Sequence, residues 1–210
     1  QAKFLSHPRC PRGAHRPPIL QPSRAHGAWG TARSSMSEVR SLTVDRRLSR
    51  QFDGLFPERD LLASEHVVVT LALQTRHRQS AMSTEMLEER QQSHGVLVDR
   101  MKAFCEHFDS IGRWCDFIDP ATGQPFRSDS ATTLMDCDER YRKLGFEILE
   151  LGCCRSLCNE KFGQCLVMTS AWVAASQAEA QAAFHILEGD GAAAEAPTDA
   201  AIGEAADAAP

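Results

Sequence analysis

The chain has 210 residues, a formal net charge of −5 at pH 7 and eight cysteines. A chain of this length can bury one core of roughly 130 to 150 residues, with additional flexible ends. No apolar run reaches the ~18 residues of a membrane-spanning helix, and no apolar segment of a secretory signal precedes the domain. Basic residues inside the domain alternate with acidic ones, which argues against a nucleic-acid surface. We therefore expect a soluble, intracellular protein with reduced thiols.

Composition divides the chain into three parts. Residues 1–43 begin with an arginine- and proline-rich segment that has no acidic residue before Glu38, so we predict a disordered arm or a leader. Residues 44–187 carry the apolar patterns of a folded domain, and residues 188–210 form an alanine-rich, acidic tail that we expect to be unfolded. The arm fits a mitochondrial presequence, a non-native translation or a plain disordered arm. Met36 is a candidate start, which would favour a cytosolic product.

The first half of the domain predicts a helix, two strands and a second helix. Apolar residues at helical spacing from Leu48 to Phe56 indicate a short amphipathic helix that Pro57 interrupts. Residues 66–73 are a β-branched and aliphatic run typical of a strand, and residues 81–87 are a weaker strand candidate, so we expect a hairpin. Six apolar residues then share one face of a helix: Leu97, Met101, Phe104, Cys105, Phe108 and Ile111.

The second half predicts short strands separated by turns. Residues 114–118 read as a strand closed by a proline- and glycine-containing turn at 119–123. The polar loop at 124–135 is a candidate contact surface because long loops in compact domains are commonly functional. Residues 136–144 predict one or two helical turns.

Two further apolar runs, at residues 146–154 and 164–173, predict strands that could pair across the polar turn at 159–163. A capping box from Ser176 to Glu179 then opens a final helix. This order of elements lacks the regular βαβ alternation of a parallel sheet. We therefore predict an α+β domain with a mainly antiparallel sheet flanked by helices.

The densest group of candidate functional residues is the sequence LGCCR at residues 151–155. The spacing disfavours zinc, because three residues separate Cys154 from Cys158, six separate Cys158 from Cys165, and no C-x-x-C occurs. The simplest interpretation makes both neighbouring cysteines small buried residues of a strand, where they would point to opposite faces.

A functional interpretation of the same segment starts from its glycine. Gly152 removes a side chain beside Cys153, so a bulky ligand can approach the backbone closely. Arg155 supplies positive charge, which favours the thiolate form of a cysteine. A thiolate is a soft ligand that suits a transition metal. From the residues alone, the buried and the metal-binding interpretations both stay open.

Other polar groups are weaker candidates. The charged segment 136–143 reads as a solvated, salt-bridged helical turn, although Asp138 and Tyr141 would share a face and could form an ordered polar contact. Asp116 and Asp119 would face opposite sides of a strand, so we reject them as a catalytic carboxylate pair. Asp119 has a more evident task in starting the proline turn.

Three motifs resemble the family of the cobalamin trafficking protein CblD, in the order and at the separations of that family. They are WCDFIDP at residues 114–120, DERYRKLGF at 138–146 and LGCC at 151–154. The resemblance covers roughly residues 44–187, is strongest from 114 to 173, and does not extend to either tail.

This resemblance implies a modified nitroreductase-like α+β fold that binds no flavin and has no catalytic activity. It implies a non-enzymatic adaptor that acts with the CblC-type processing protein and directs cobalamin to cytosolic methionine synthase and mitochondrial methylmalonyl-CoA mutase. By resemblance, Cys153 is the thiolate that coordinates cobalt, with Gly152, Cys154 and Arg155 around it. The chain would then serve both cytoplasm and mitochondrion.

The resemblance also implies that Asp138, Tyr141 and Leu151 serve partner binding by shaping the surface around the thiol. Cys158 and Cys165 do not match the family pattern and could compete for metal or form a disulfide. Two alternatives therefore stay open. One is a residual flavin-dependent reductase, and the other is a thiol-rich zinc or redox module.

Overall fold

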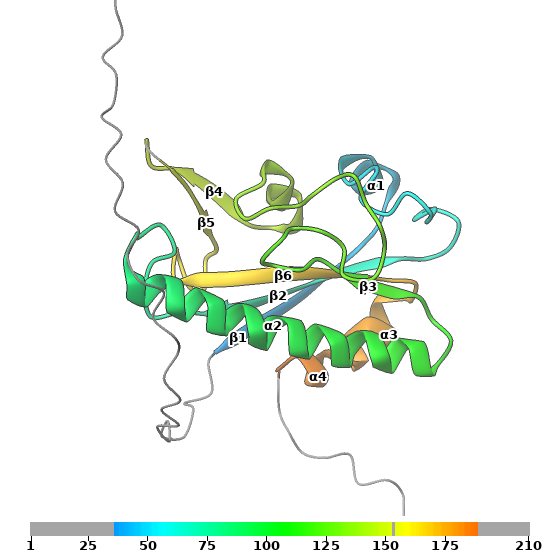
Figure 1. Cartoon of the computed structure of the whole chain (residues 1–210). Helices are drawn as coiled ribbons and strands as arrows, with labels where there is room; N and C mark the ends of the chain where they lie inside the picture. Colours follow the sequence, from blue (N-terminus) through cyan, green and yellow to red (C-terminus); the bar gives the residue numbers. More distant parts are fainter. Residues whose placement is uncertain (1–35, 153, 189–210) are drawn as a thin grey trace, which may run out of the picture. The chain divides into compact units, whose positions relative to one another are not determined.

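A four-stranded antiparallel sheet forms the centre of the folded domain (Figure 1). The computed structural model describes residues 36–152 and 154–188. The strand order is β1-β2-β6-β3, and every neighbouring pair is antiparallel. These strands are Ser37–Thr43 (β1), Val67–Gln74 (β2), Leu166–Val173 (β6) and Cys115–Phe117 (β3). Helices cover the sheet, so the predicted α+β class with a mainly antiparallel sheet is confirmed.

The two central strands account for the longest apolar runs of the domain. All eight residues of β6 and seven of the eight residues of β2 are buried, because layers of structure cover both faces of the sheet. The predicted strand at 66–73 is thus confirmed, but its predicted hairpin partner at 81–87 is wrong. β2 pairs instead with β1 and β6.

The segment predicted as a second strand belongs to a helix. Helix α2, Thr84–Ser110, begins where the Ser83 hydroxyl accepts a hydrogen bond of 3.2 Å from the Met86 backbone N–H. This N-cap outweighs the weak strand pattern of the segment. Five of the six residues predicted on the apolar face are buried, whereas Ile111 follows the last turn and is exposed. No helix within the described residues is both long and apolar enough to cross a membrane.

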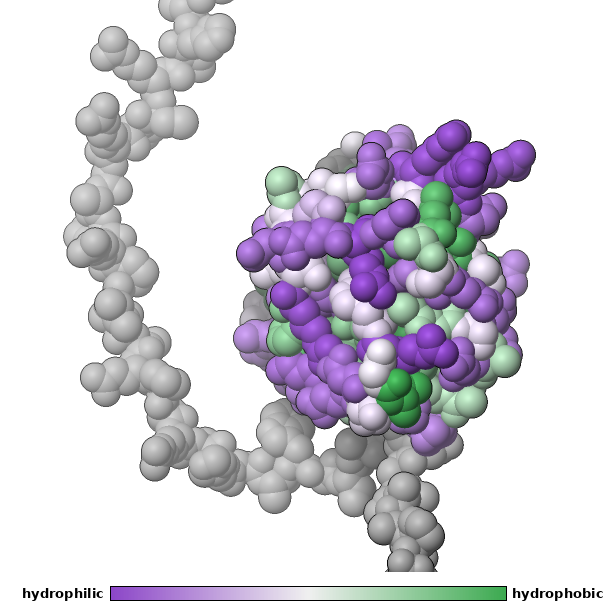
Figure 2. Space-filling view, turned by 90° about the vertical axis from the view of Figure 1, so that its right-hand side faces the viewer, coloured by the Kyte–Doolittle hydropathy of each residue, from purple (hydrophilic) through white to green (hydrophobic). Residues whose placement is uncertain are grey.

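Helix α2 covers one face of the sheet together with α3, Gln177–Ala182, and α4, Phe184–Glu188 (Figure 1). The capping box predicted at Ser176 and Glu179 opens α3. The end of the molecule near the last turn of α2 is mainly hydrophilic, with small, separated apolar patches (Figure 2).

The opposite face of the sheet carries the candidate site. Helix α1, Arg46–Gln51, and the 3₁₀ helix η1, Glu139–Leu144, lie on this face with a separate hairpin (Figure 1). The hairpin consists of β4, Glu147–Glu150, and β5, Arg155–Cys158. The predicted pairing of 146–154 with 164–173 is therefore wrong, because β4 pairs with β5, whereas β6 pairs with β2 and β3.

The boundary predicted at residue 43 also needs correction. Strand β1 lies inside the predicted arm, where it forms the edge of the sheet and pairs with β2 from Ser37 to Thr43. The last proline before β1 is Pro22, so no proline opposes a strand over Ser37–Thr43. The rest of the predicted arm, the tail from residue 189 and Cys153 lie outside the described residues.

Candidate functional site

The described residues Leu151, Gly152 and Cys154 of the LGCCR motif lie between β4 and β5, and Arg155 begins β5. The Leu151 backbone N–H donates to the Cys154 carbonyl at 2.9 Å and closes the turn. Gly152 has a φ of +83°, which L side chains rarely adopt, and a Cβ at this position would meet no atom within 4 Å. Glycine is therefore required for the turn conformation, and the space around it is open. Cys154 is exposed rather than buried in a strand.

Arg155 has two carboxylate partners beside this turn. Its guanidinium lies 3.1 Å from Glu150 and 3.5 Å from Glu139, and half of the side chain is exposed. These pairs connect the hairpin to η1 and compensate much of the positive charge. The sequence predicted a cation beside the cysteines, but it did not predict the two acidic partners.

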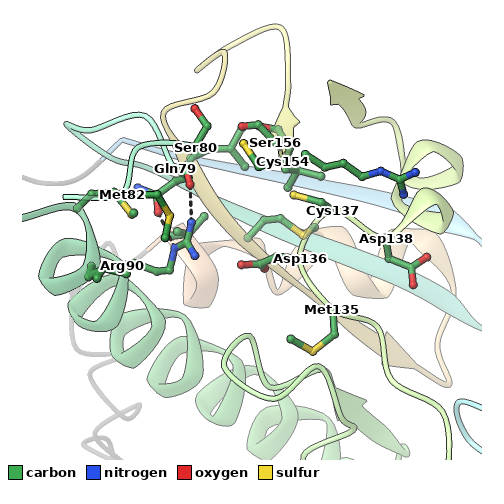
Figure 3. Close-up of a pocket in the computed structure, with 17 residues that line it drawn as sticks. Gln79, Ser80, Met82, Arg90, Met135, Asp136, Cys137, Asp138, Cys154 and Ser156 are labelled. Atoms are coloured by element: carbon green, nitrogen blue, oxygen red, sulfur yellow. Dashed lines mark hydrogen bonds between the residues drawn. The ribbon is translucent and has the colours of Figure 1, made fainter. Parts of the chain in front are cut away.

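A pocket of about 560 Å³ lies beside the turn (Figure 3). Five segments form it: the loop before α2, the first turns of α2, residues 135–138, β5 and the start of β6. Its apolar lining consists of Met82, Met86, Leu87, Met135, Leu157, Leu166, Val167 and Met168. Cys137 and Cys154 add two thiols to the wall. A cavity of this size, mainly apolar with a few polar groups, has the usual character of a small-ligand site.

Four charged residues line the pocket: Arg90, Asp136, Asp138 and Arg155. Figure 3 shows Asp136 and Arg90 facing one another. Surrounding protein atoms desolvate Asp136 and raise the pKa of its carboxyl, an effect that His94 and Arg90 oppose. Arg90 donates to the side-chain oxygen of Gln79 at 2.9 Å and to its carbonyl at 2.6 Å. The arginine is thus held in place by the loop before α2.

Cys137 has an unusual backbone conformation. Its φ of +62° is the only positive value for a non-glycine residue within the described part of the chain. Burial raises the pKa of its thiol, and a backbone N–H from Leu157 partly offsets this shift. Backbone strain of this kind concentrates at ligand and functional sites.

Asp138 and Tyr141 hold η1 in place. The Asp138 carboxylate caps η1 and accepts hydrogen bonds from the Arg140 backbone at 2.9 Å and from its guanidinium at 2.8 Å. These contacts lower the pKa of Asp138. Tyr141 is 3% exposed, its hydroxyl donates to the Leu134 carbonyl at 3.3 Å, and burial raises its pKa. Of the three residues predicted for partner binding, Leu151 alone is well exposed, at 42%.

The two aspartates rejected as a catalytic pair have structural tasks. Asp116 is fully buried and accepts backbone hydrogen bonds from Phe117, Arg127 and Ser128 at 2.8 to 3.0 Å. Asp119 accepts one from Ala121 at 2.9 Å, which confirms its predicted role at the start of the turn.

The remaining thiols are distributed over the domain. Cys158 lies on β5, where burial raises its pKa, and Cys165 precedes β6. Within residues 36–152 and 154–188, no group of three or more His, Cys, Asp and Glu side chains could hold a metal ion.

Fold and site together define an α+β domain that presents a cysteine-containing hairpin turn beside a pocket. Residues 27–184 match the family model described as methylmalonic aciduria and homocystinuria type D protein. The chain belongs to this family.

Curated relatives agree with this assignment. The chain is 33% identical over 138 residues to the cobalamin trafficking protein CblD of Rattus norvegicus, covering 65% of this chain and 46% of the relative. It is 31% identical over 138 residues to the protein of that name from Homo sapiens, with the same coverage. The Gallus gallus protein is 33% identical over 124 residues, which cover 59% of this chain and 41% of the relative. The chain thus spans about half the length of the curated relatives it matches.

Proposed function

We propose that this chain is a non-enzymatic adaptor in intracellular cobalamin trafficking. Its cargo is cobalamin, and the thiolate of Cys153 replaces a weak axial ligand of the cobalt. Family membership carries this proposal, together with the position of the LGCC motif at the hairpin turn. A Cβ at Gly152 would meet no atom within 4 Å, so the immediate approach to the backbone of the turn is open.

In this proposal the domain docks on a CblC-type processing protein that carries cobalamin. Ligation by Cys153 would hold the cargo during transfer toward methionine synthase in the cytoplasm and methylmalonyl-CoA mutase in the mitochondrion. The domain would have a modified nitroreductase-like fold and bind no flavin. Leu151 would contact the partner directly because it is exposed on the turn. Asp138 and Tyr141 would act through the position of η1.

The test is a titration of the chain into cobalamin, with and without the processing protein, followed by visible absorbance. Wild type with loaded partner should shift the spectrum, whereas Cys153→Ser should not. Cys154→Ser is the matched control and should retain most of the shift. Because ligation needs the thiolate, acidification should weaken it. A spectral shift that persists in Cys153→Ser would refute the role of this thiol.

A further inference from the structure

Exposed apolar side chains gather around the pocket beside the turn. Met82, Leu87 and Met135 are 90%, 50% and 47% exposed, and all three line the pocket. Its floor continues the apolar surface with the buried side chains of Met86 and Met168. A surface of this kind is typical of a site that another molecule covers. Flexible methionines in particular adapt to an irregular, methyl-bearing surface.

The polar groups of the pocket select the chemistry of an occupant. Within the described residues, the Asp136 carboxylate has no hydrogen-bond or ion-pair partner, and it points into the hollow (Figure 3). It can therefore accept a hydrogen bond from a ligand N–H. The two lining cations are already engaged, Arg90 by Gln79 and Arg155 by Glu150 and Glu139. A neutral amide suits this set of groups better than a phosphate or a carboxylate does.

We propose that this pocket binds the amide-bearing edge of a corrinoid. In this assignment Asp136 accepts a hydrogen bond from a peripheral carboxamide, and Met82 and Met135 pack against ring methyl groups. The assignment rests on the proposed function and deepens it, because it adds a site that distinguishes corrinoids by their periphery.

Size and position support an edge-on contact. The periphery of a corrin ring carries both methyl groups and primary carboxamides, which match the apolar rim and the carboxylate of Asp136. The volume of about 560 Å³ suits a side-chain cluster of the ligand but not a whole cobalamin. Cys154 lines the pocket, and the Cα atoms of consecutive residues are about 3.8 Å apart. A ligand held at residue 153 therefore has its edge within reach of the pocket.

The decisive experiment uses corrinoids that differ in one peripheral group. We would titrate four corrinoids into the full chain and compare their dissociation constants. They are hydroxocobalamin and its three monocarboxylate derivatives, in each of which one propionamide is hydrolysed. Wild type should bind at least one monocarboxylate about tenfold more weakly than the amide, since a carboxylate offers no N–H and repels Asp136. In Asp136→Asn, this difference should fall below about twofold because the negative charge is removed.

Matched variants separate this effect from a general loss of structure. Asp129→Asn, on the loop that lines a different cavity, should keep the wild-type preference. Met82→Ala should weaken all four corrinoids equally, by about threefold, whereas Met36→Ala, another exposed methionine, should change nothing. Thermal unfolding of each variant checks the fold.

The outcomes distinguish this assignment from the proposed function. If wild type binds amide and monocarboxylates equally, or if Asp136→Asn keeps the preference, the pocket assignment is overturned. The Cys153-dependent spectral shift would then still support the adaptor. If the chain binds no corrinoid, alone or with the processing protein, both proposals fail.

Discussion

Two regions of the domain place cysteines in opposite surroundings. Cys105 on α2 and Cys115 on β3 are 0% and 1% exposed, and their sulfur atoms lie 2.6 Å apart inside the core. Burial raises the pKa of Cys115 well above its usual value. Cys154, in contrast, is exposed at a hairpin turn that a left-handed glycine shapes. We refer to these regions as the sealed pair and the open turn.

The comparison shows that packing, rather than the number or spacing of cysteines, sets the chemistry available to a thiol. The sealed pair lies between a long helix and the sheet, next to Phe104, Phe108 and Phe117. The open turn connects two four-residue strands, which form a two-stranded sheet apart from the central sheet. A thiol in the first setting is a small apolar side chain, whereas one in the second can meet a ligand or reagent.

Thiol labelling should give the largest difference between the two regions. In a Cys153→Ser background, which leaves one cysteine on the turn, iodoacetamide should label Cys154 about 1,000-fold faster than Cys115. Labelling of the sealed pair needs a local opening, and a cost of about 4 kcal/mol reduces the rate by this factor. Mass spectrometry of the alkylated peptides measures both rates, and all rates should become similar in denaturant. If Cys154 and Cys115 are alkylated at rates within tenfold of each other in the native protein, the two regions do not differ in thiol accessibility.

Asp116 should have the next largest effect, because it anchors the chain beside the sealed pair. Asp116→Ala leaves three backbone N–H groups without their acceptor and should lower the free energy of unfolding by about 3 kcal/mol. Asp116→Asn keeps one acceptor oxygen and should lose about half as much. Urea denaturation gives these values, and faster labelling of Cys115 should accompany the loss. If Asp116→Ala leaves the free energy of unfolding unchanged, these hydrogen bonds do not hold the region together.

A smaller effect is expected for Asp138, which supports the open turn through η1. Its pKa is lowered in the folded state, so its stabilising contribution is present above the unfolded pKa of about 3.9 and is lost as pH falls through the folded value. Asp138→Asn should therefore cost about 1 kcal/mol at pH 7 and almost nothing at pH 2. Unfolding free energies of both proteins at the two pH values test this. An equal loss of unfolding free energy at both pH values would show that the charge of Asp138 does not contribute to stability.

Asp45 offers a matched control for that change. It caps α1 by accepting a hydrogen bond from the Leu48 backbone at 2.7 Å, and within the described residues it has no arginine partner. Asp45→Asn should therefore cost less than Asp138→Asn at pH 7, because asparagine is an equally good N-cap.

Local patterns predicted the elements of the fold, whereas long-range pairing was not predictable from them. The β-branched run of β2, the helical period of α2 and the capping box of α3 each act within a few residues. The partner of β2 depends on segments about 30 and 100 residues away, and no local pattern contains this information. The strand predicted at 81–87 failed because the cap at Ser83 outweighed a weak strand preference.

The candidate site was predictable only where it is contiguous in sequence. The glycine and two cysteines of the turn form one motif, which the family resemblance made specific. Asp136 and Arg90 lie in the same pocket but are 46 positions apart in sequence. Neither has a distinctive local pattern, since Asp136 is part of a charged run and Arg90 is one of many helix-surface cations. Only the fold brings them together.

The smallest effect is expected at the open turn itself. Cys154→Ser should change the free energy of unfolding by less than about 0.5 kcal/mol, because the residue is exposed and serine keeps a hydrogen-bonding group. The backbone hydrogen bond from Leu151 that closes the turn does not depend on this side chain. Cys115→Ser, which buries a hydroxyl in the core, should cost about 1 to 3 kcal/mol. If urea denaturation gives the two serine variants equal costs, the turn is as tightly packed as the core, and a ligand could not reach it without unfolding the hairpin.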